Sequence, residues 1–249
     1  MSTIQTFGTA VSAPAGSSDS VDGILLIDKP IGPTSHDIVA RIRHYCRIPK
    51  VGHGGTLDPM ASGLMILLLG KATKLSDRFL GSDKTYEGTM HFGISTDSQD
   101  AMGAVLRTAD ASAVTEEAVW NQMQSRLGDS MQMPPMVSAL KVNGVPLYKR
   151  ARQGIEVERK ARLIHLYRFD LHSFTSPCAE FSVNCTKGTY VRTLCADIGD
   201  ALGCGAHLSR LRRTRCGALS IDDALPLAEA LTLSPAQLAT RIIPMRNFL

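Results

Sequence analysis

The sequence lacks the patterns that mark secreted, membrane and zinc-binding proteins. Its six cysteines never form a C-x-x-C pair or another zinc-type spacing, so we expect reduced, buried thiols and no metal site. The one strongly apolar run, residues 64–69, is too short to cross a bilayer. Residues 1–22 have neither a basic start nor an apolar centre, which predicts a disordered leader and no signal peptide. These absences favour a cytoplasmic protein.

Motifs for nucleotide and hydrolase chemistry are missing as well. Residues 63–72 superficially resemble a P-loop, but Met65 stands at its first glycine and Ala72 replaces the Ser or Thr after the lysine. The two G-x-G sequences, at Gly52 and Gly203, carry leucine where a dinucleotide-binding loop has its third glycine. Neither G-x-S-x-G nor H-E-x-x-H occurs. The sequence therefore excludes the common kinase, GTPase and dinucleotide-binding classes.

The charge of the chain is unevenly distributed. The net charge is only +4, but residues 141–215 hold 14 Lys and Arg against 6 Asp and Glu, which leaves +8 there and −4 over the rest. Phosphate contacts supply most of the non-specific affinity of proteins for nucleic acids, so this asymmetry predicts a polyanionic partner. A solvated basic face without a partner is the alternative.

Hydrophobic periodicity predicts an α+β fold built on a mixed, mainly antiparallel sheet. Helices are expected after N-caps at Ser35 and Thr115 and over residues 194–202. Residues 97–110 are polar and are predicted to form an exposed loop, and residues 190–192 are expected to be extended. Regular strand–helix alternation is absent, which argues against a doubly wound sheet. The expected strands are residues 23–28, 65–69, 84–92, 162–174, 179–186 and 207–215, the last of them basic and edge-like.

One stretch, residues 51–63 (VGHGGTLDPMASG), combines glycines with a carboxylate. Glycines let another molecule approach the backbone closely. Asp58 precedes Pro59, which biases it towards an extended conformation and displays its carboxylate from a loop. An ordinary turn, in which Asp58 bonds its own backbone, explains this stretch equally well. The rest of the chain must decide between the two interpretations.

Six motifs follow one another along the chain: GILLIDKPIGPTSHD (residues 23–37), VGHGGTLDPMASGLMILLLGKATK (51–74), KTYEG (84–88), PPMVSALKVNGVPLYKRAR (134–152), CTKGTYVRTLCADIGDALG (185–203) and HLSRLRRTRCG (207–217). Taken in this order, they resemble those of bacterial tRNA pseudouridine synthases of the TruB type. The resemblance spans residues 23–244 and implies the pseudouridine synthase fold with a thumb-like insertion at about residues 131–152. It also implies isomerisation of one uridine, at position 55 in the T loop of tRNA, by base flipping and without a cofactor or a metal.

The resemblance implies roles for seven residues. Asp58 matches the catalytic nucleophile, a carboxylate that can attack and then leave again. Arg192 matches the arginine that pairs with it and keeps it ionised. Tyr86 matches the tyrosine that stacks on the flipped base and, if activated, takes the C5 proton. The remaining substrate-binding positions match a second active-site tyrosine, an apolar wall, a supporting lysine and a histidine that fills the space left by the base: Tyr190, Leu211, Lys29 and His53. Without the resemblance, these last four residues would be interpreted as ordinary core, turn or loop residues.

The same resemblance predicts the RNA contacts and the domain organisation. We expect a catalytic domain at residues 23–219, a helical linker at 220–249, and no further C-terminal RNA-binding domain of the kind that many family members carry. The expected phosphate contacts are Lys141, Lys149, Arg150, Arg152, Lys187, Arg212 and Arg213.

The expected partner is tRNA, recognised through its T arm. The chain is expected to act as a monomer, with no obligate protein partner and no membrane association. Two alternatives remain open at this point. One is a tRNA-folding chaperone with little or no isomerase activity, and the other is a subunit of an RNA-guided ribonucleoprotein.

Overall fold

The computed structural model describes residues 22–138, 141–142, 145–146 and 157–248. The helices of these ranges are α1 (Ser35–Cys46), α2 (Ser76–Gly81), α3 (Glu116–Gln124), α5 (Val191–Ala201), α6 (Leu227–Ala230) and α7 (Pro235–Ala239), with 3-10 turns η1 (Gly70–Leu75), η2 (Ile221–Asp223) and η3 (Met245–Phe248). The strands of the main sheet are β1 (Gly23–Lys29), β2 (Val51–His53), β3 (Ala61–Leu69), β4 (Lys84–Phe92), β7 (Gly128–Gln132), β10 (Arg162–Thr175), β11 (Cys178–Cys185), β12 (Ala206–Cys216), β13 (Leu219–Ser220), β14 (Leu225–Pro226) and β15 (Ile243–Pro244). Two separate hairpins join β5 (Ile94–Thr96) to β6 (Val105–Thr108) and β8 (Lys141–Val142) to β9 (Val145–Pro146).

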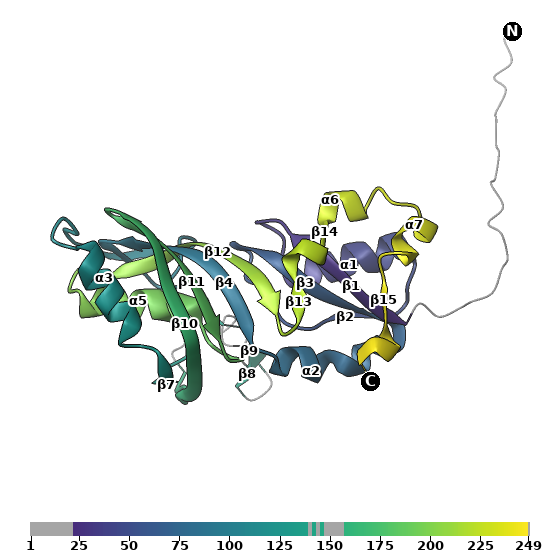
Figure 1. The fold of residues 1–249 in the computed structure, drawn as a ribbon, viewed down its shortest axis with the longest axis horizontal. Helices are drawn as coiled ribbons and strands as arrows, with labels where there is room; N and C mark the ends of the chain where they lie inside the picture. The colour runs from purple at the N-terminus through teal and green to yellow at the C-terminus, as the bar shows by residue number, and fades with distance from the viewer. Residues whose placement is uncertain (1–21, 139–140, 143–144, 147–156, 249) are drawn as a thin grey trace, which may run out of the picture.

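The main sheet runs through the length of the molecule in the order β14-β1-β3-β12-β4-β11-β10-β7 (Figure 1). Among the described strands of this sheet, β1 with β14 and β3 with β12 pair in parallel, and the other neighbours are antiparallel. The expected α+β class with a mixed, mainly antiparallel sheet is confirmed. The segment after β12 adds the short strands β14 and β15 to β1. The predicted domain boundaries stay predictions. The predicted leader lies almost wholly outside the described residues.

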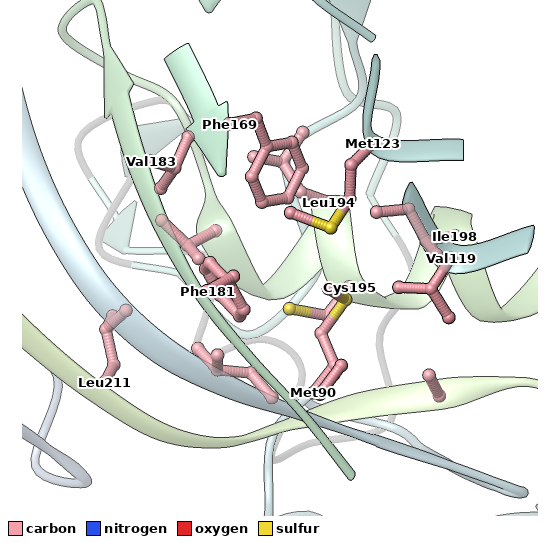
Figure 2. Close-up of a cluster of buried hydrophobic side chains, with 14 of the residues drawn as sticks. Met90, Val119, Met123, Phe169, Phe181, Val183, Leu194, Cys195, Ile198 and Leu211 are labelled. Carbon is pink, nitrogen blue, oxygen red and sulfur yellow. The ribbon is translucent and has the colours of Figure 1, made fainter. Parts of the chain in front are cut away.

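The largest hydrophobic cluster packs α3 and α5 against one face of β4, β10, β11 and β12 (Figure 2). Phe169 and Phe181 meet edge to face with ring centroids 5.4 Å apart, and Leu194 and Ile198 of α5 are buried in the same cluster. Burial of such side chains stabilises the fold by about 1.5–3 kcal/mol each. This packing fixes the N-terminus of α5, which proves to be part of the site.

The first helix differs slightly from the expectation. The sequence predicted Ser35 as the N-cap, but the N-cap is Thr34, which forms a capping box with Asp37. Ser35 instead lies inside the first turn, where it is 3% exposed. Its hydroxyl donates to the carbonyl of Leu57 (3.0 Å) and accepts from the Leu57 amide (2.8 Å). The helix thereby anchors the loop that carries Asp58.

The prediction of β12 as an edge strand was wrong, because β12 pairs with both β3 and β4. Its basic sequence suggested solvent exposure. Leu208 and Leu211 of this strand are nevertheless buried, and Arg213 is only 2% exposed. Arg213 can be buried because backbone carbonyls surround its guanidinium.

The prediction of an exposed loop over residues 97–110 was also incomplete. This segment holds part of the β5–β6 hairpin, and Asp100 within it is 5% exposed. The hydroxyl of Thr96 donates to the Asp100 carbonyl (2.7 Å), and that of Ser98 donates to its carboxylate (2.6 Å). Local hydrogen bonds therefore let a polar sequence bury a carboxylate.

Candidate active site

A pocket of about 270 Å³ opens where the loop after β2 meets the start of α5. Its size is near the lower end for small-ligand sites. Five of the seven residues predicted for catalysis and substrate binding line it: Asp58, Tyr86, Tyr190, Arg192 and Leu211. They come from separate parts of the chain, on the β2–β3 loop, β4, the N-terminus of α5 and β12. The fold therefore brings together residues that are up to 153 positions apart in sequence.

Asp58 is paired with a buried arginine. The Nε of Arg192 lies 3.0 Å from Oδ2 of Asp58, with the arginine side chain 4% exposed and the aspartate side chain 38% exposed. The amide of Ala61 donates to the carbonyl of Asp58 at 3.0 Å, which closes a tight turn over Pro59. The carboxylate is thus fixed on one side and open to the pocket on the other.

The guanidinium of Arg192 has further partners that hold its orientation. Nη1 donates to the carbonyl of Ser98 (2.8 Å) and Nη2 to the carbonyl of Val137 (3.0 Å). Nη1 also lies 3.5 Å from Oδ2 of Asp100, a second buried carboxylate. Sequence reasoning missed Asp100, because nothing in its polar surroundings shows that the chain folds back onto Arg192. A single arginine therefore links two carboxylates that lie 42 positions apart.

These contacts act on the pKa of Asp58 in opposite directions. Burial raises the pKa of this carboxyl, Arg192 lowers it, Asp100 raises it and Lys29 lowers it, and the net effect is a rise. A carboxylate with a raised pKa is more basic than an exposed one. Asp58 is therefore a candidate nucleophile whose ionisation depends on its charged neighbours.

Tyr86 and Leu211 also line the pocket. Leu211 is 7% exposed and belongs to the large hydrophobic cluster (Figure 2), and Tyr86 packs against that cluster. Burial raises the pKa of the Tyr86 phenol to about 12, with Arg213 acting against this rise. The phenol is therefore protonated at neutral pH, and Leu211 adds an apolar surface to the same pocket.

Tyr190 and Arg192 do not share one extended segment as predicted. Tyr190 is extended (φ −98°, ψ 105°) and is the N-cap residue, but Val191 begins α5, so Arg192 is helical. Both nevertheless line the pocket, because the chain turns between them. Sequence spacing alone could not show this change of conformation.

Lys29 lies behind the Asp58 loop rather than on a surface turn. It is fully buried, and its ammonium donates to the carbonyls of Ala61 (2.6 Å), Pro30 (3.0 Å) and Pro59 (3.5 Å). Burial lowers the pKa of Lys29 to about 8, with Asp58 raising it and Arg213 lowering it. Lys29 thereby joins the end of β1 to the backbone that follows Asp58.

Replacement of Lys29 by Met is expected to lower the free energy of unfolding by about 2–4 kcal/mol, because it leaves buried carbonyls without a donor. The folded pKa of about 8 lies below the ordinary value of 10.5, so between these pH values the unfolded chain binds more protons. Wild-type stability therefore gains a contribution as pH rises through this window, and the variant lacks it. Urea unfolding at pH 7 and pH 9.5 measures both effects, with exposed Lys74→Met as the control. Equal stability of the two variants would contradict the assignment.

Arg213 was predicted to contact phosphate, and the structure places it differently. Arg213 lines the pocket, and its guanidinium donates to the carbonyls of Leu64 (2.8 Å), Gly55 (3.2 Å) and Thr56 (3.4 Å). Arg213 is therefore buried and supports the glycine-rich loop from inside, whereas an exposed position was expected. Its contact to a phosphate stays a prediction.

The other predicted nucleic-acid contacts have varied positions. Lys187 is exposed beside the pocket, between the lining residues Thr186 and Gly188. Arg212 forms a bidentate pair with Asp28 at 3.0 and 2.7 Å, and its side chain is 37% exposed. Lys141 lies in β8, while three more lie outside the described residues: Lys149, Arg150 and Arg152.

His53 lies on β2, half-buried and just before the pocket loop. The amide of Gly55 donates to its Nδ1 at 3.3 Å, and burial is the main cause that lowers the pKa of its ring. His53 is therefore neutral at physiological pH. It lies next to the pocket loop without lining the pocket in this structure.

Within the described ranges, no three His, Cys, Asp or Glu side chains are grouped so that they could hold a metal ion. In the same part of the chain, none of the helices has the length and apolar character needed to cross a membrane.

Comparison with known proteins identifies the family. A family model described as "TruB family pseudouridylate synthase (N terminal domain)" matches residues 43–191, and one described as "tRNA pseudouridylate synthase B C-terminal domain" matches residues 192–249. The chain is thus a pseudouridine-forming enzyme by family. The chain belongs to the TruB family of pseudouridylate synthases, which confirms the resemblance seen in the sequence.

Individual relatives agree with this assignment. A protein of Opitutus terrae named tRNA pseudouridine synthase B is 51% identical over 225 residues, which cover 90% of this chain and 93% of that relative. One of the same name from Dechloromonas aromatica is 48% identical over 90% of this chain and 75% of its own. A solved Cbf5-Nop10-Gar1 complex contains a chain that matches with a TM-score of 0.71 and 30% identity, over 91% of this chain and 61% of that one.

Proposed function

We propose that this enzyme converts uridine 55 in the T loop of tRNA to pseudouridine, with the Asp58 carboxylate as the nucleophile. The observation that carries the proposal is the Asp58–Arg192 pair at 3.0 Å, placed in one pocket with Tyr86 and Leu211. The two relatives above are both named tRNA pseudouridine synthase B, which supports tRNA as the substrate. The basic charge of residues 141–215 also favours a tRNA substrate. We expect the enzyme to act in the cytoplasm.

The reaction breaks the bond between ribose C1′ and uracil N1 and forms one between C1′ and C5. A proton leaves C5 and N1 gains one, so substrate and product have the same composition. Asp58 forms a temporary bond, either to C1′ or to the uracil ring, and is released when the new bond forms. Arg192 holds the carboxylate in position for both events.

The pocket walls suit a flipped uracil. Removing a base from a folded loop costs about a few kcal/mol, which stacking and phosphate contacts must offset. The ring of Tyr86 and the side chain of Leu211 offer the apolar surfaces for that stacking. Because the pKa of Tyr86 is about 12, we assign it ring contact first, and it accepts the C5 proton only if bound substrate lowers that pKa. His53, neutral and next to the loop, would occupy the space that the base leaves.

The test uses purified chain and two transcripts of one tRNA, with uridine or cytidine at position 55. Pseudouridine mapped only at position 55 of the first supports the proposal, and modification elsewhere in both transcripts contradicts it. A bare T-arm hairpin separates the alternatives, since an RNA-guided subunit would not act on it alone. A folding chaperone would improve tRNA folding with no pseudouridine formed.

Asp100→Asn is expected to move the acid limb of kcat/KM to lower pH. The Asp100 carboxylate raises the pKa of Asp58, so its neutralisation lowers that pKa and keeps Asp58 ionised further into acid. The plateau rate is expected to fall about tenfold, because Arg192 loses a charged partner. The pH profile of pseudouridine formation measures both, with exposed Asp223→Asn as the control. A limb that stays in place would show that Asp100 does not act on Asp58, and one that moves to higher pH would contradict the direction of the interaction.

A further inference from the structure

Tyr190 is held by a buried glutamine as well as by its own helix. No side-chain hydrogen bond caps α5 at Tyr190. Instead, Oε1 of Gln132 accepts from the Tyr190 amide at 2.8 Å, and Nε2 of Gln132 donates to the Tyr190 carbonyl at 3.1 Å. Gln132 ends β7 and is 4% exposed. One side-chain amide thus satisfies both backbone groups of a single residue, which fixes the position of that residue closely.

The ring of Tyr190 is held by an arginine from the neighbouring strand. The Cζ of Arg162 lies 5.7 Å from the centre of the Tyr190 ring, within the range of a cation–π contact. Arg162 also packs on Gly188, where φ is +79° and an added Cβ would stand 3.2 Å from Nη1 of Arg162. The guanidinium therefore lies over the loop that enters α5 and against the tyrosine ring.

These two residues are direct partners in the sheet. Gln132 of β7 and Arg162 of β10 face each other in the antiparallel register. One rung of the sheet therefore supplies both contacts, to the backbone and to the ring of the same tyrosine. The two residues are 30 positions apart and belong to no motif of the site, so only their pairing in the sheet shows that both contact Tyr190.

We propose that Gln132 and Arg162 are positioning residues that set the ring of Tyr190 against the flipped uridine. The inference rests on the proposed function and deepens it, because Tyr190 lines the pocket together with Asp58. A tyrosine at the N-cap of a helix has freedom in both its backbone and its χ angles. The Gln132–Arg162 pair removes that freedom before RNA binds, so the Tyr190 ring is already in position when the flipped base enters the pocket.

The first test observes Tyr190 directly and needs no activity. The chain has five tyrosines, so labelling with 3-fluorotyrosine gives five fluorine resonances, and Tyr190→Phe identifies the one that belongs to Tyr190. Arg162→Lys keeps the charge but loses the planar guanidinium that lies over the ring. We expect this variant and Gln132→Met to shift or broaden the Tyr190 resonance while the other four stay in place. An unchanged Tyr190 resonance in Arg162→Lys overturns the proposal.

The second test asks whether Arg162 acts through Tyr190. Arg162→Lys is expected to lower the single-turnover rate of pseudouridine formation about threefold to tenfold, with the Kd for tRNA changed less than about twofold. In a Tyr190→Leu background the same substitution is expected to have no further effect. Additive effects in the two backgrounds, or a weaker Kd with an unchanged rate, would instead mark Arg162 as an independent RNA contact and overturn the proposal.

The two tests separate failure of the inference from failure of the proposed function. A wild-type chain that forms no pseudouridine contradicts the function, whereas the fluorine spectra still decide whether the rung holds Tyr190. Because Gln132 is buried, folding of Gln132→Met is checked by circular dichroism, and Arg162→Lys carries the test if that variant does not fold. Lys160→Met, an exposed substitution two residues before Arg162, is the control, and it is expected to leave the Tyr190 resonance in place.

Discussion

Asp58→Asn is expected to lower the rate of pseudouridine formation by at least about 10⁴-fold, because the amide is not a nucleophile under these conditions. The two groups are nearly the same size, and the side-chain carbonyl oxygen of the new amide would still accept a hydrogen bond from Arg192. The fold and the affinity for tRNA are therefore expected to stay close to those of the wild type. Chromatography of nucleosides from digested tRNA measures the rate, and filter binding measures the affinity.

The control for this prediction is Asp223→Asn, the same chemical change at an exposed position on η2. Its rate is expected to equal that of the wild type. If Asp58→Asn retained more than about one hundredth of the rate, the carboxylate would act by position or charge alone, and nucleophilic catalysis would have to be assigned elsewhere.

Arg192→Gln is expected to produce the second largest loss, about 10²- to 10³-fold in rate. The substitution removes the cation that contacts both Asp58 and Asp100. Arg192 lowers the pKa of Asp58, so its loss raises that pKa further and moves the acid limb of kcat/KM to higher pH. This direction is opposite to that expected for Asp100→Asn, and the pair of pH profiles tests the sign of each interaction.

Arg192→Gln also leaves the buried carboxylate of Asp100 and the partly exposed carboxylate of Asp58 without their partner. Removal of one member of a buried ion pair commonly costs about 3–5 kcal/mol of stability. The double variant Arg192→Gln with Asp100→Asn removes one of those charges, so part of the lost stability is expected to return. Arg192→Lys is the charge-conserving control, and it is expected to recover little activity because one ammonium cannot reach Asp58, Ser98 and Val137 in the geometry of the guanidinium. Full activity of Arg192→Lys would show that charge alone is needed.

The sequence predicted the parts of the site that lie in short motifs. The resemblance of these motifs to a known family implied Asp58, Tyr86, Tyr190, Arg192 and Leu211, and the structure brings the five residues into one pocket. The α+β class followed from hydrophobic periodicity, because strand and helix periods differ. The family resemblance, rather than the chemistry of single residues, thus indicated which residues meet in the pocket.

Contacts between distant segments were not predictable in the same way. Asp100 looked like one acid in a polar loop, and only the folded β5–β6 hairpin places it beside Arg192. Arg213 looked like a surface cation, because the sequence does not show the three carbonyls that surround it. Both residues were expected to be exposed and are buried for one physical reason: the burial of a charge depends on partners that are far away in sequence.

Tritium release from tRNA labelled at C5 of uridine tests the role of Asp58 most directly, with the wild-type chain and Asp58→Asn compared and tRNA binding followed on the same samples. We expect release by the wild type alone and binding by both proteins. Equal release by the two proteins would contradict the role of Asp58. Binding by both without release by either would contradict the isomerase and favour the folding chaperone.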